Sequence, residues 1–485
     1  MSYKVFPGKK SGREETCAAL STFRRNSFLL LQKAIGSGLK ERYQELLLLE
    51  KKSHDEVAKI HHDRLRATLL HASSSVPFYR TRVPSSPWGD LQGFPIVSRA
   101  AIQEDPFSFM PDEFRITYRE HKAREWGYGW SLVHTGGSTG APITVVQDRD
   151  FADRMRAARM YFQHLCEFPF GVPYFYLWGS MYELEHRRKG LRPRATALLA
   201  GEEHLNGFHM EDSHMRTYVR LIHESGIRHM IAYVDAAVAL ARYSAENNSG
   251  PPPLSSIMTT SGSLMPSDRA LLSSVLAVRV HNKYGSRDCG EIACECEEGK
   301  LHVLSPGVHL EVVDSLGSPV PHGREGRILV TCLSNRCFPL IRYDIGDVGI
   351  LSEDQCLCGR PFPLLDAVLG RAAEYLTSAS GGFVSPVYIR QLIGVAHKRD
   401  FIRRYQIIQR TKTAFSLFLE VTDNADATSV HEVVSSICID LRRVLGSISL
   451  DTHIVNRIPP TPSGKFLYSV NHFSRYCGPD PAHSG

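Results

Sequence analysis

The 485-residue sequence lacks long apolar runs. No stretch approaches the ~20 apolar residues that a membrane-spanning helix needs. The longest run near the start, residues 28–31, is a fragment of an amphipathic helix. The first ten residues are basic but lack the apolar core of a signal peptide. These absences predict a cytoplasmic protein with no membrane partner.

Internal repeats, low-complexity segments and a basic stripe are also absent. The net charge of +6 is spread along the chain, whereas nucleic-acid binding needs clustered basic residues or a known module. We therefore expect no nucleic-acid partner; a small anionic substrate fits this charge balance, as does no partner at all. The eleven cysteines are unevenly spread, which favours a reducing cytosol with some thiols in the core and some on metal.

The chain is longer than one ordinary domain of ~100–200 residues. Helical spacing of apolar residues marks residues 41–75, and a turn-rich segment follows. A β-branched run predicts a strand at 143–146, and residues 210–245 read as two helices around a strand at 230–234. Alternating helices and strands then continue to about residue 370, which indicates an α/β fold.

Beyond this point the pattern changes to that of a small α+β unit. Paired strands are expected at 401–409 and 415–421, a helix at 426–445 that Gly446 ends, and a strand at 448–455. The predicted fold class is α/β: a large N-terminal domain of several subdomains with β-sheets and helices, and a small mobile α+β C-terminal domain. The predicted boundaries are 1–369 for the first domain, 370–374 for a hinge and 375–485 for the second.

The most informative stretch is a glycine-rich loop, His134-Thr135-Gly136-Gly137-Ser138-Thr139-Gly140-Ala141-Pro142. Three glycines let the backbone turn tightly and aim successive N–H groups into one concavity, and the hydroxyl groups add donors. Such a loop suits the phosphates of a nucleotide. It is neither a Walker loop nor a dinucleotide fingerprint, because the spacing of both is missing. Taken alone, the same composition is equally typical of a flexible surface turn.

Four further segments follow in order: Tyr284-Gly285-Ser286-Arg287-Asp288, Arg342-Tyr343-Asp344-Ile345-Gly346-Asp347, Gly370-Arg371 and Pro462-Ser463-Gly464-Lys465. Together with the loop they resemble the motifs of the adenylate-forming superfamily, which includes acyl-CoA synthetases, luciferases and peptide-synthetase adenylation domains. Residues 76–80 and 91–96 resemble the amino-terminal signatures of its phenylacetate–CoA ligase and CapK-like branch. The resemblance covers nearly the whole chain.

The resemblance implies an AMP-producing ligase that uses ATP and Mg²⁺. It assigns Lys465 and Asp288 to catalysis, Asp288 as the metal-binding acid. It assigns cofactor binding to Thr135, Gly136, Gly137, Ser138, Thr139, Gly140, Tyr284, Gly285, Ser286, Asp347 and Arg371. In that family the aromatic residue stacks near adenine, and the final Asp and the Arg approach the ribose.

The sequence departs from the family pattern at three places. Asp288 stands where the family usually has Glu, so metal reach is in doubt, and Glu291 is an alternative ligand. Ile143 replaces the common Lys after the loop. Ala372 and Ala373 follow Gly-Arg in place of a charged hinge residue, which leaves the details of domain rotation open.

The residue types suit adenylation, in which a carboxylate attacks the α-phosphorus of ATP and pyrophosphate leaves. Both reactants are anionic, so positioning and charge neutralisation dominate catalysis. Lys465 would place positive charge between them, and Mg²⁺ near Asp288 would neutralise the phosphates. A lysine on a mobile domain can then withdraw so that an acceptor reaches the acyl adenylate. The simpler alternative for Lys465 is a solvated surface lysine.

A structural zinc site is predicted within residues 294–360. Cys296, His302, Cys356 and Cys358 supply three thiolates and one imidazole, a closed tetrahedral set typical of structural Zn²⁺. CapK-like relatives carry a similar arrangement. Cys294 competes with Cys296 for the same role, and the alternative for all of them is buried or free thiols.

The substrate is predicted less sharply. Candidate contacts to the carboxylic acid are His134, Trp178, Tyr233, Ser261 and Gly262. The preferred hypothesis is activation of a small aromatic acid followed by transfer to CoA. The alternatives are transfer to an amine or another nitrogen nucleophile, and a catalytically silent nucleotide-binding scaffold. The sequence leaves open the acid, the acceptor (CoA, amine or carrier protein), the pathway and the choice between monomer and homodimer.

Overall fold

The structure of the chain is a computed structural model. It describes residues 12–83, 91–115, 130–135, 143–178, 191–207, 210–393, 397, 401–422, 425–459, 461 and 466–478. Within these ranges every helix is too short or too polar to cross a lipid bilayer.

Helices open the described chain: α1 (Gly12–Ala34), α2 (Leu39–Leu49), α3 (His54–Ser75) and α4 (Pro77–Arg80). α3 begins at a capping box in which Ser53 and Glu56 satisfy each other's backbone N–H groups. Pro77 begins α4, where its missing N–H costs no helical hydrogen bond. α2 and α3 confirm the helices expected over 41–75.

Short elements then lead to the glycine-rich segment: η1 (Leu91–Gly93), α5 (Arg99–Glu104), η2 (Pro106–Phe109), β1 (Trp130–Thr135), β2 (Ile143–Asp148) and α7 (Arg149–Leu165). β1 and β2 form an antiparallel pair in which Thr135 is the register partner of Ile143. The two ends of the glycine-rich loop are therefore held side by side. Asp148 accepts from the N–H of Phe151 at 2.7 Å and so caps α7.

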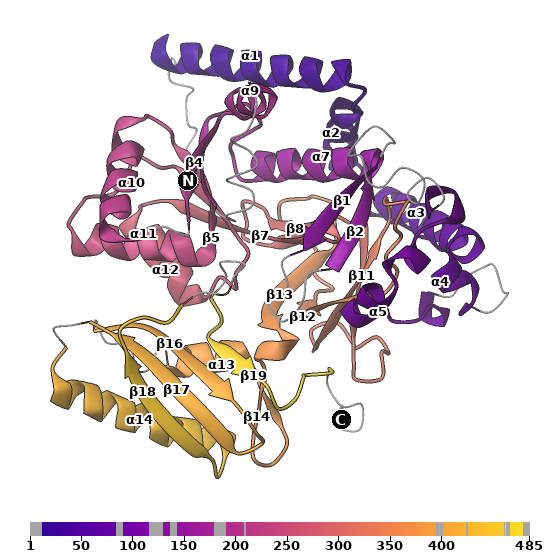
Figure 1. Cartoon of the computed structure of the whole chain (residues 1–485). Helices are drawn as coiled ribbons and strands as arrows, with labels where there is room; N and C mark the ends of the chain where they lie inside the picture. Colours follow the sequence, from indigo (N-terminus) through magenta and orange to yellow (C-terminus); the bar gives the residue numbers. More distant parts are fainter. Residues whose placement is uncertain are drawn as a thin grey trace, which may run out of the picture.

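The largest sheet in the described chain has eleven strands, in the order β10-β11-β12-β13-β9-β8-β7-β6-β5-β3-β4. Its parallel half contains β3 (Tyr174–Trp178), β4 (Glu202–Asn206), β5 (His229–Tyr233), β6 (Ser256–Thr260) and β7 (Arg279–Ser286). The helices of this half are α9 (Leu191–Ala200), α10 (Asp212–Glu224), α11 (Val234–Glu246) and α12 (Pro266–Val275). Helices α10 to α12 pack on one face, and α7 packs on the other (Figure 1).

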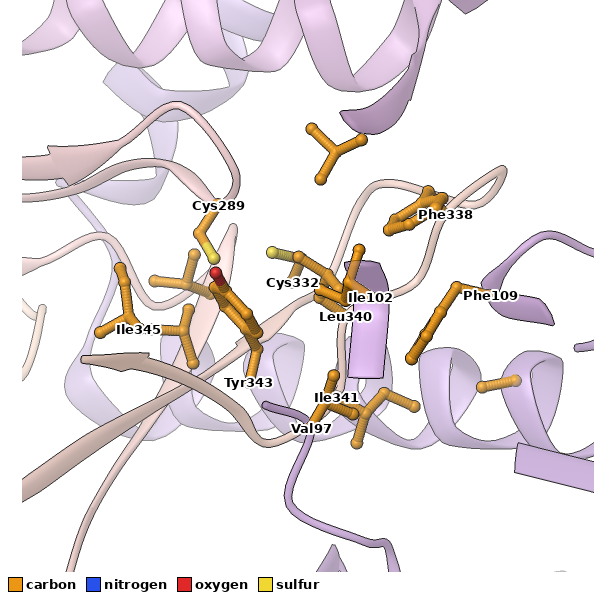
Figure 2. Close-up of a cluster of buried hydrophobic side chains, with 14 of the residues drawn as sticks. Val97, Ile102, Phe109, Cys289, Cys332, Phe338, Leu340, Ile341, Tyr343 and Ile345 are labelled. Atoms are coloured by element: carbon orange, nitrogen blue, oxygen red, sulfur yellow. The ribbon is translucent and has the colours of Figure 1, made fainter. Parts of the chain in front are cut away.

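The other half of the sheet is antiparallel and contains β8 (Gly290–Glu295), β9 (Leu301–Val303), β10 (Val308–Val313), β11 (Glu325–Cys332), β12 (Tyr343–Leu351) and β13 (Leu364–Arg371). One face of this half packs against α3, α5 and β2 and forms a hydrophobic core. In this core, Phe109, Phe338 and Tyr343 are among the fully buried side chains (Figure 2). Figure 2 also shows the Tyr343 ring pointing its hydroxyl toward Cys289, in the loop after β7.

A C-terminal unit follows the large sheet after η3 (Ala372–Glu374). It contains β14 (Leu376–Thr377), β15 (Phe383–Val384), α13 (Pro386–Gln391), β16 (Ile402–Gln409), β17 (Ala414–Val421), α14 (Ala427–Leu445), β18 (Ser449–Val455) and β19 (Ser469–Asn471). Its four-stranded sheet has the order β18-β17-β16-β19, and the apolar stripe of α14 packs on it. Figure 1 shows this unit as a separate body at one end of the large sheet. The α/β fold class is confirmed.

The end of the described chain returns from the C-terminal unit to the large sheet. The Tyr476 ring stacks on Tyr375 with centroids 4.3 Å apart, and its hydroxyl donates to Glu325 at 3.2 Å. Arg475 lies 3.7 Å from Asp344. Residues 472–478 therefore connect the two parts of the molecule a second time, beside the first connection at η3.

Arg342, the first residue of one sequence motif, is a structural residue. It is 4% exposed, and its Nε lies 3.2 Å from Glu311. Its Nη atoms donate to the carbonyls of Phe94 at 3.2 Å and Gly317 at 2.7 Å. This guanidinium ties the segment after η1 to β10 and to the turn between β10 and β11.

Replacing Arg342 by Met should lower the free energy of unfolding by about 3–5 kcal/mol, because the buried Glu311 loses its ionic partner. Urea unfolding of the purified variant measures this loss. The double variant Arg342→Met/Glu311→Gln should recover part of the stability by removing the orphaned charge. A single variant as stable as the parent would contradict this role.

Candidate active site and metal site

The site lies where the parallel strands end. Trp178 ends β3, Tyr233 ends β5, and Ser261 with Gly262 directly follow β6. Because parallel strands end at one edge of a sheet, these residues come together although they are far apart in sequence. Crevices at this edge are where open α/β sheets bind ligands.

Tyr284, Asp347 and Arg371 form one hydrogen-bonded cluster. The Tyr284 hydroxyl donates to Asp347 Oδ2 at 2.8 Å, and Arg371 Nε lies 3.0 Å from Asp347 Oδ1. Arg371 also donates to the carbonyl of Ile345 at 2.9 Å. Burial and the adjacent Asp347 charge raise the pKa of Tyr284, and the Asp347 charge is the main cause of the raised pKa of Arg371. The carboxylate thus has fixed donors on both oxygens.

This cluster closes a gap in the sheet. Asp347 and Arg371 are register partners on β12 and β13, but Tyr284 is on β7, with β9 and β8 between them in the strand order. β9 pairs with β13 only at Leu364 and Leu365. Beyond that point β13 leaves its neighbour, and the Tyr284–Asp347 hydrogen bond spans the space. The sequence motifs named all three residues; their direct contact had no sequence signal.

Asp288 lies in the loop between β7 and β8 and is 6% exposed. Its Oδ2 accepts from the Tyr343 hydroxyl at 2.9 Å, and among the described residues Oδ1 has no hydrogen-bond partner. Burial raises the pKa of this carboxyl, while Tyr343 and Arg99 lower it in part. In the same loop, Ser286 accepts from the N–H of Cys289 at 3.0 Å and so shapes the turn.

Gly285 fits the close approach of β7 and β8. A Cβ built at this position would lie 2.7 Å from the carbonyl oxygen of Gly290, which no side chain tolerates. Glu291, the alternative metal ligand, is not available: Lys283 Nζ donates to both of its oxygens at 2.8 and 2.6 Å, and Arg159 Nε lies 3.4 Å away. The structure therefore favours Asp288.

Several predicted residues fall outside the described parts of the chain. They are Gly136, Gly137, Ser138, Thr139, Gly140 and Lys465. His134 and Thr135 are described as backbone in β1, while their side chains are not described. The roles of all these residues stay predictions.

An aromatic row lines the ends of β3 and β5. The Trp178 and Tyr233 ring centroids are 4.2 Å apart, and Tyr176 stacks on Trp178 at 4.8 Å with an interplanar angle of 10°. Beside this row, a Cβ built on Gly262 would lie 3.1 Å from Val234 Cβ, so Gly262 lets the loop after β6 approach the start of α11. The row offers an aromatic surface for an organic acid, with the Trp178 and Tyr233 rings tilted by 39°.

The C-terminal unit contacts the same edge. Arg390 of α13 pairs with Asp268 at 3.0 Å and donates to the carbonyl of Ser263 at 3.0 Å. Phe466, which directly follows Lys465 in the sequence, donates its backbone N–H to Asp235, at the start of α11 beside Tyr233. The unit is therefore seated next to the aromatic row.

Glu374, at the connection between the two parts, has a pKa raised to about 7, mainly by burial. The nearby Arg371 and Arg390 lower it in part. The predicted hinge at 370–374 thus contains a carboxyl group that titrates near neutral pH.

The second candidate site joins Cys296, His302, Cys356 and Cys358, whose ligand atoms all lie within 4.8 Å of one another. Cys296 Sγ is 3.6 Å from Cys356 Sγ, and Cys358 Sγ is 3.2 Å from His302 Nε2. His302 Nδ1 lies 3.2 Å from the carbonyl of Phe362, which leaves Nε2 facing the thiols. Burial lowers the pKa of His302 to about 4, so the imidazole is neutral at pH 7, as a metal ligand must be.

Cys294 does not belong to this group. Its sulfur lies 3.8 Å from Cys166 on the face covered by α7, and both thiols are buried. Cys294 lies within β8, whereas Cys296 follows the end of that strand at Glu295, so strand alternation does not hold the two thiols on one face. The structure selects Cys296.

Sequence reasoning missed a set of buried charges next to Tyr284. Lys283, Glu291 and Arg159 form an ion triad between α7 and strands β7 and β8; Lys283 is 8% exposed. A lysine before Tyr284 was visible in the sequence, but nothing there linked it to Arg159, which is 124 positions earlier (283 minus 159).

The C-terminal unit matches the family model described as the CapK C-terminal domain over residues 376–472. The chain is 31% identical over 140 residues to a phenylacetate–coenzyme A ligase of Thermus thermophilus, which covers 28% of this chain and 31% of that protein. It is 22% identical over 278 residues to the protein CapK of Staphylococcus aureus, covering 55% of this chain and 58% of CapK. The matched region thus spans less than two thirds of either relative.

The fold resembles that of 2-hydroxyisobutyryl-CoA ligase. In the postadenylation state of that enzyme, bound to R3-HIB-AMP, the TM-score is 0.63 at 15% identity, covering 89% of this chain and 91% of the other. In its thioesterification state, bound to 2-HIB-AMP and CoA, the TM-score is 0.53 at 16% identity, covering 87% and 91%. The predicted resemblance to the adenylate-forming superfamily and its phenylacetate–CoA ligase and CapK-like branch is confirmed.

Substituting Glu374 by Gln should stabilise the protein only at higher pH. The folded pKa of about 7 lies above the ordinary value of 4.5, so protonated Glu374 contributes stability that is complete below pH 4.5 and lost as the pH rises through 7. Gln mimics the protonated group. The variant should match the parent at pH 4.5 and exceed it by about 1–3 kcal/mol at pH 8 in urea unfolding.

The exposed Glu432→Gln change on α14 is the matched control and should give no such pH-dependent difference. A stability difference for Glu374→Gln that stays constant from pH 4.5 to 8 would contradict the assignment.

We expect one tightly held zinc per chain on the four-residue cluster. Metal analysis of the purified protein should find it, and Cys296→Ser should lose it, because the set then lacks one thiolate. Cys294→Ser, two residues away on the strand, should keep the metal. Zinc-free parent protein, or equal zinc loss in both variants, would remove the site.

Proposed function

We propose that this chain, a relative of CapK and phenylacetate–CoA ligase with the fold of the adenylate-forming enzymes, is an AMP-producing ligase. It activates a small carboxylic acid with ATP, releases pyrophosphate and transfers the acyl group to an acceptor. CoA is the preferred acceptor and an aromatic acid the preferred substrate. Transfer to an amine is the alternative that product analysis must separate.

The observation that carries this proposal is Asp347 held between Tyr284 and Arg371. Two donors fix the orientation of the carboxylate, and each oxygen keeps an acceptor lone pair for a ribose hydroxyl. Rigid acceptors of this kind suit the 2′- and 3′-hydroxyls of a nucleoside. A silent scaffold would not need the further acid, Asp288, at the same edge.

The residues near Asp288 fit a divalent cation. One carboxylate oxygen is oriented by Tyr343, and the other has no partner among the described residues. Asp288 would hold Mg²⁺, whose charge, when bound, neutralises the phosphates of ATP. The glycine-rich loop, whose ends β1 and β2 hold together, would bind those phosphates through its backbone N–H groups.

Lys465 would supply the positive charge between the substrate carboxylate and the α-phosphate. Support comes from its neighbour Phe466, which contacts Asp235 at the edge that carries Trp178 and Tyr233. The higher TM-score to the postadenylation state than to the thioesterification state is consistent with this orientation of the C-terminal unit. Rotation about residues 370–374 would then withdraw the lysine and admit the acceptor.

The rotation must also accommodate the second connection. Tyr476 stacks on Tyr375, within the C-terminal unit, and bonds to Glu325, in the large sheet. Arg475 adds a longer ion pair to Asp344. Tyr375 and Tyr476 form a small buried cluster with Val348 and Ala372, so a rotation would have to break or rearrange this cluster.

The proposal is tested by a pyrophosphate-release screen over aryl, short-chain and dicarboxylic acids. At least one acid should stimulate release in the presence of ATP and Mg²⁺. Offering CoA or candidate amines and weighing the product then identifies the acceptor. Pyrophosphate release that no acid stimulates would overturn the ligase proposal and favour a nucleotide-binding scaffold.

Lys465→Ala should reduce pyrophosphate release ~10²–10³-fold while leaving the unfolding midpoint unchanged, because it removes one transition-state charge contact. Lys412→Ala, at an exposed turn of the same C-terminal unit, is the matched control and should keep parental activity. Equal rates for Lys465→Ala and the parent would rule out the role.

A further inference from the structure

The ion triad of Lys283, Glu291 and Arg159 is an unusual feature beside an apolar pocket wall. Lys283 and Glu291 are nearly buried and bond twice, at 2.8 and 2.6 Å. Burying three charges costs several kcal/mol of desolvation each unless partners compensate it. Glu291 is fully compensated by two cations. The triad therefore carries one net positive charge. Lys283 lies closest to Glu291 and neutralises it, so the charge of Arg159 is the one left over.

Arg159 has unused donors. Its Nε contacts Glu291 at 3.4 Å, and within the described part of the chain its two terminal nitrogens have no hydrogen-bond partner. Its side chain is 38% exposed although it lies on α7 between buried neighbours. A guanidinium has five N–H donors in a fixed fork, so four remain for a ligand. Glu202, on the neighbouring strand β4, accepts from Tyr174 at 2.9 Å and lies 3.1 Å from His204.

The fork lies next to the aromatic row. Ala158 and Met160, the neighbours of Arg159 on α7, pack in one cluster with Tyr176, whose ring stacks on Trp178. Tyr176 is two residues before Trp178, which ends β3, so this part of the row lies roughly 6–7 Å below the sheet edge at ~3.3 Å per residue. The edge is where Phe466 meets Asp235. An acid lying along the row would thus have its reacting carboxyl group at the edge and its other end at Arg159.

We propose that Arg159 is a specificity residue that binds a second, oxygen-bearing group of the carboxylic acid, remote from the reacting carboxyl. This inference rests on the proposed ligase function and narrows its substrate class. The substrate is a polar acid, with a carboxylate, hydroxyl or keto oxygen at its far end, in place of a plain hydrocarbon acid. A carboxylate matches the excess charge best, because a guanidinium binds it with two parallel hydrogen bonds.

Matched pairs of acids test the inference: phenylacetate against 4-hydroxyphenylacetate and 4-carboxyphenylacetate, and hexanoate against adipate. The parent should favour the oxygen-bearing member about 10- to 100-fold in kcat/KM for pyrophosphate release, the value of a hydrogen bond to a charged donor. Arg159→Met keeps the length of the side chain and removes its donors, so it should abolish the preference. Arg159→Lys, which keeps the charge and loses the fork, should retain part of it for the dicarboxylates.

Arg156→Met, one turn earlier on α7, is the matched control, because Arg156 contacts Gln32 and Asp153 away from the triad. It should keep the parental preference. The inference is overturned if the parent uses the hydrocarbon acids equally well, or if Arg159→Met slows both members of each pair by the same factor. The latter result would indicate a structural role.

Failure of the ligase proposal has a different signature. If no acid stimulates pyrophosphate release, binding is measured in place of turnover. The measurement is the thermal unfolding temperature of the protein in the presence of each acid. Stabilisation of the parent by adipate or 4-carboxyphenylacetate, lost in Arg159→Met, would keep the binding site. No stabilisation by any oxygen-bearing acid would overturn it.

Discussion

The hydrogen-bonded carboxylate of Asp347 is the interaction on which the site depends. It links β7, β12 and β13 across a place where the sheet has no continuous ladder. One of its partners, Arg371, is the last residue of β13 and directly precedes η3. The same contact therefore positions the candidate ribose acceptor and fixes the start of the connection to the C-terminal unit. A carboxylate can do both because its two oxygens accept from two different directions.

Two other largely buried arginines of the described chain have carboxylate partners. Arg342 is neutralised by Glu311 inside the antiparallel half, and Arg390 by Asp268 under the C-terminal unit. Both guanidinium groups spend further donors on backbone carbonyls. Arg159 differs, since within the described residues its terminal nitrogens have no hydrogen-bond partner. This contrast with Arg342 and Arg390 is the basis for proposing Arg159 as a ligand-binding residue.

Much of the local structure was readable from the sequence. Apolar periodicity located α14, and the paired strands β16 and β17 lie close to their expected positions; Asp426 caps the helix. The family resemblance of the motifs named Tyr284, Asp347 and Arg371; Arg371 ends β13, while Tyr284 and Asp347 lie within β7 and β12. The sequence did not reveal β1, whose partner β2 was expected, because pairing over a loop is decided by contact and not by composition. It also gave no reason to separate Cys294 from Cys296.

The sequence by itself determined the element types, the order of the motifs and the chemistry of the side chains, since these depend on local spacing and residue type. Only the tertiary structure decided which of those side chains meet. The parallel strand order brought Trp178 and Tyr233 to one edge, and the fold placed Arg159 of α7 on Glu291 of β8. The four residues of the predicted zinc site were named from the sequence, and the fold brings them together from positions some 60 residues apart (356 minus 296). Contacts of this kind arise from packing between distant segments, and no local pattern encodes them.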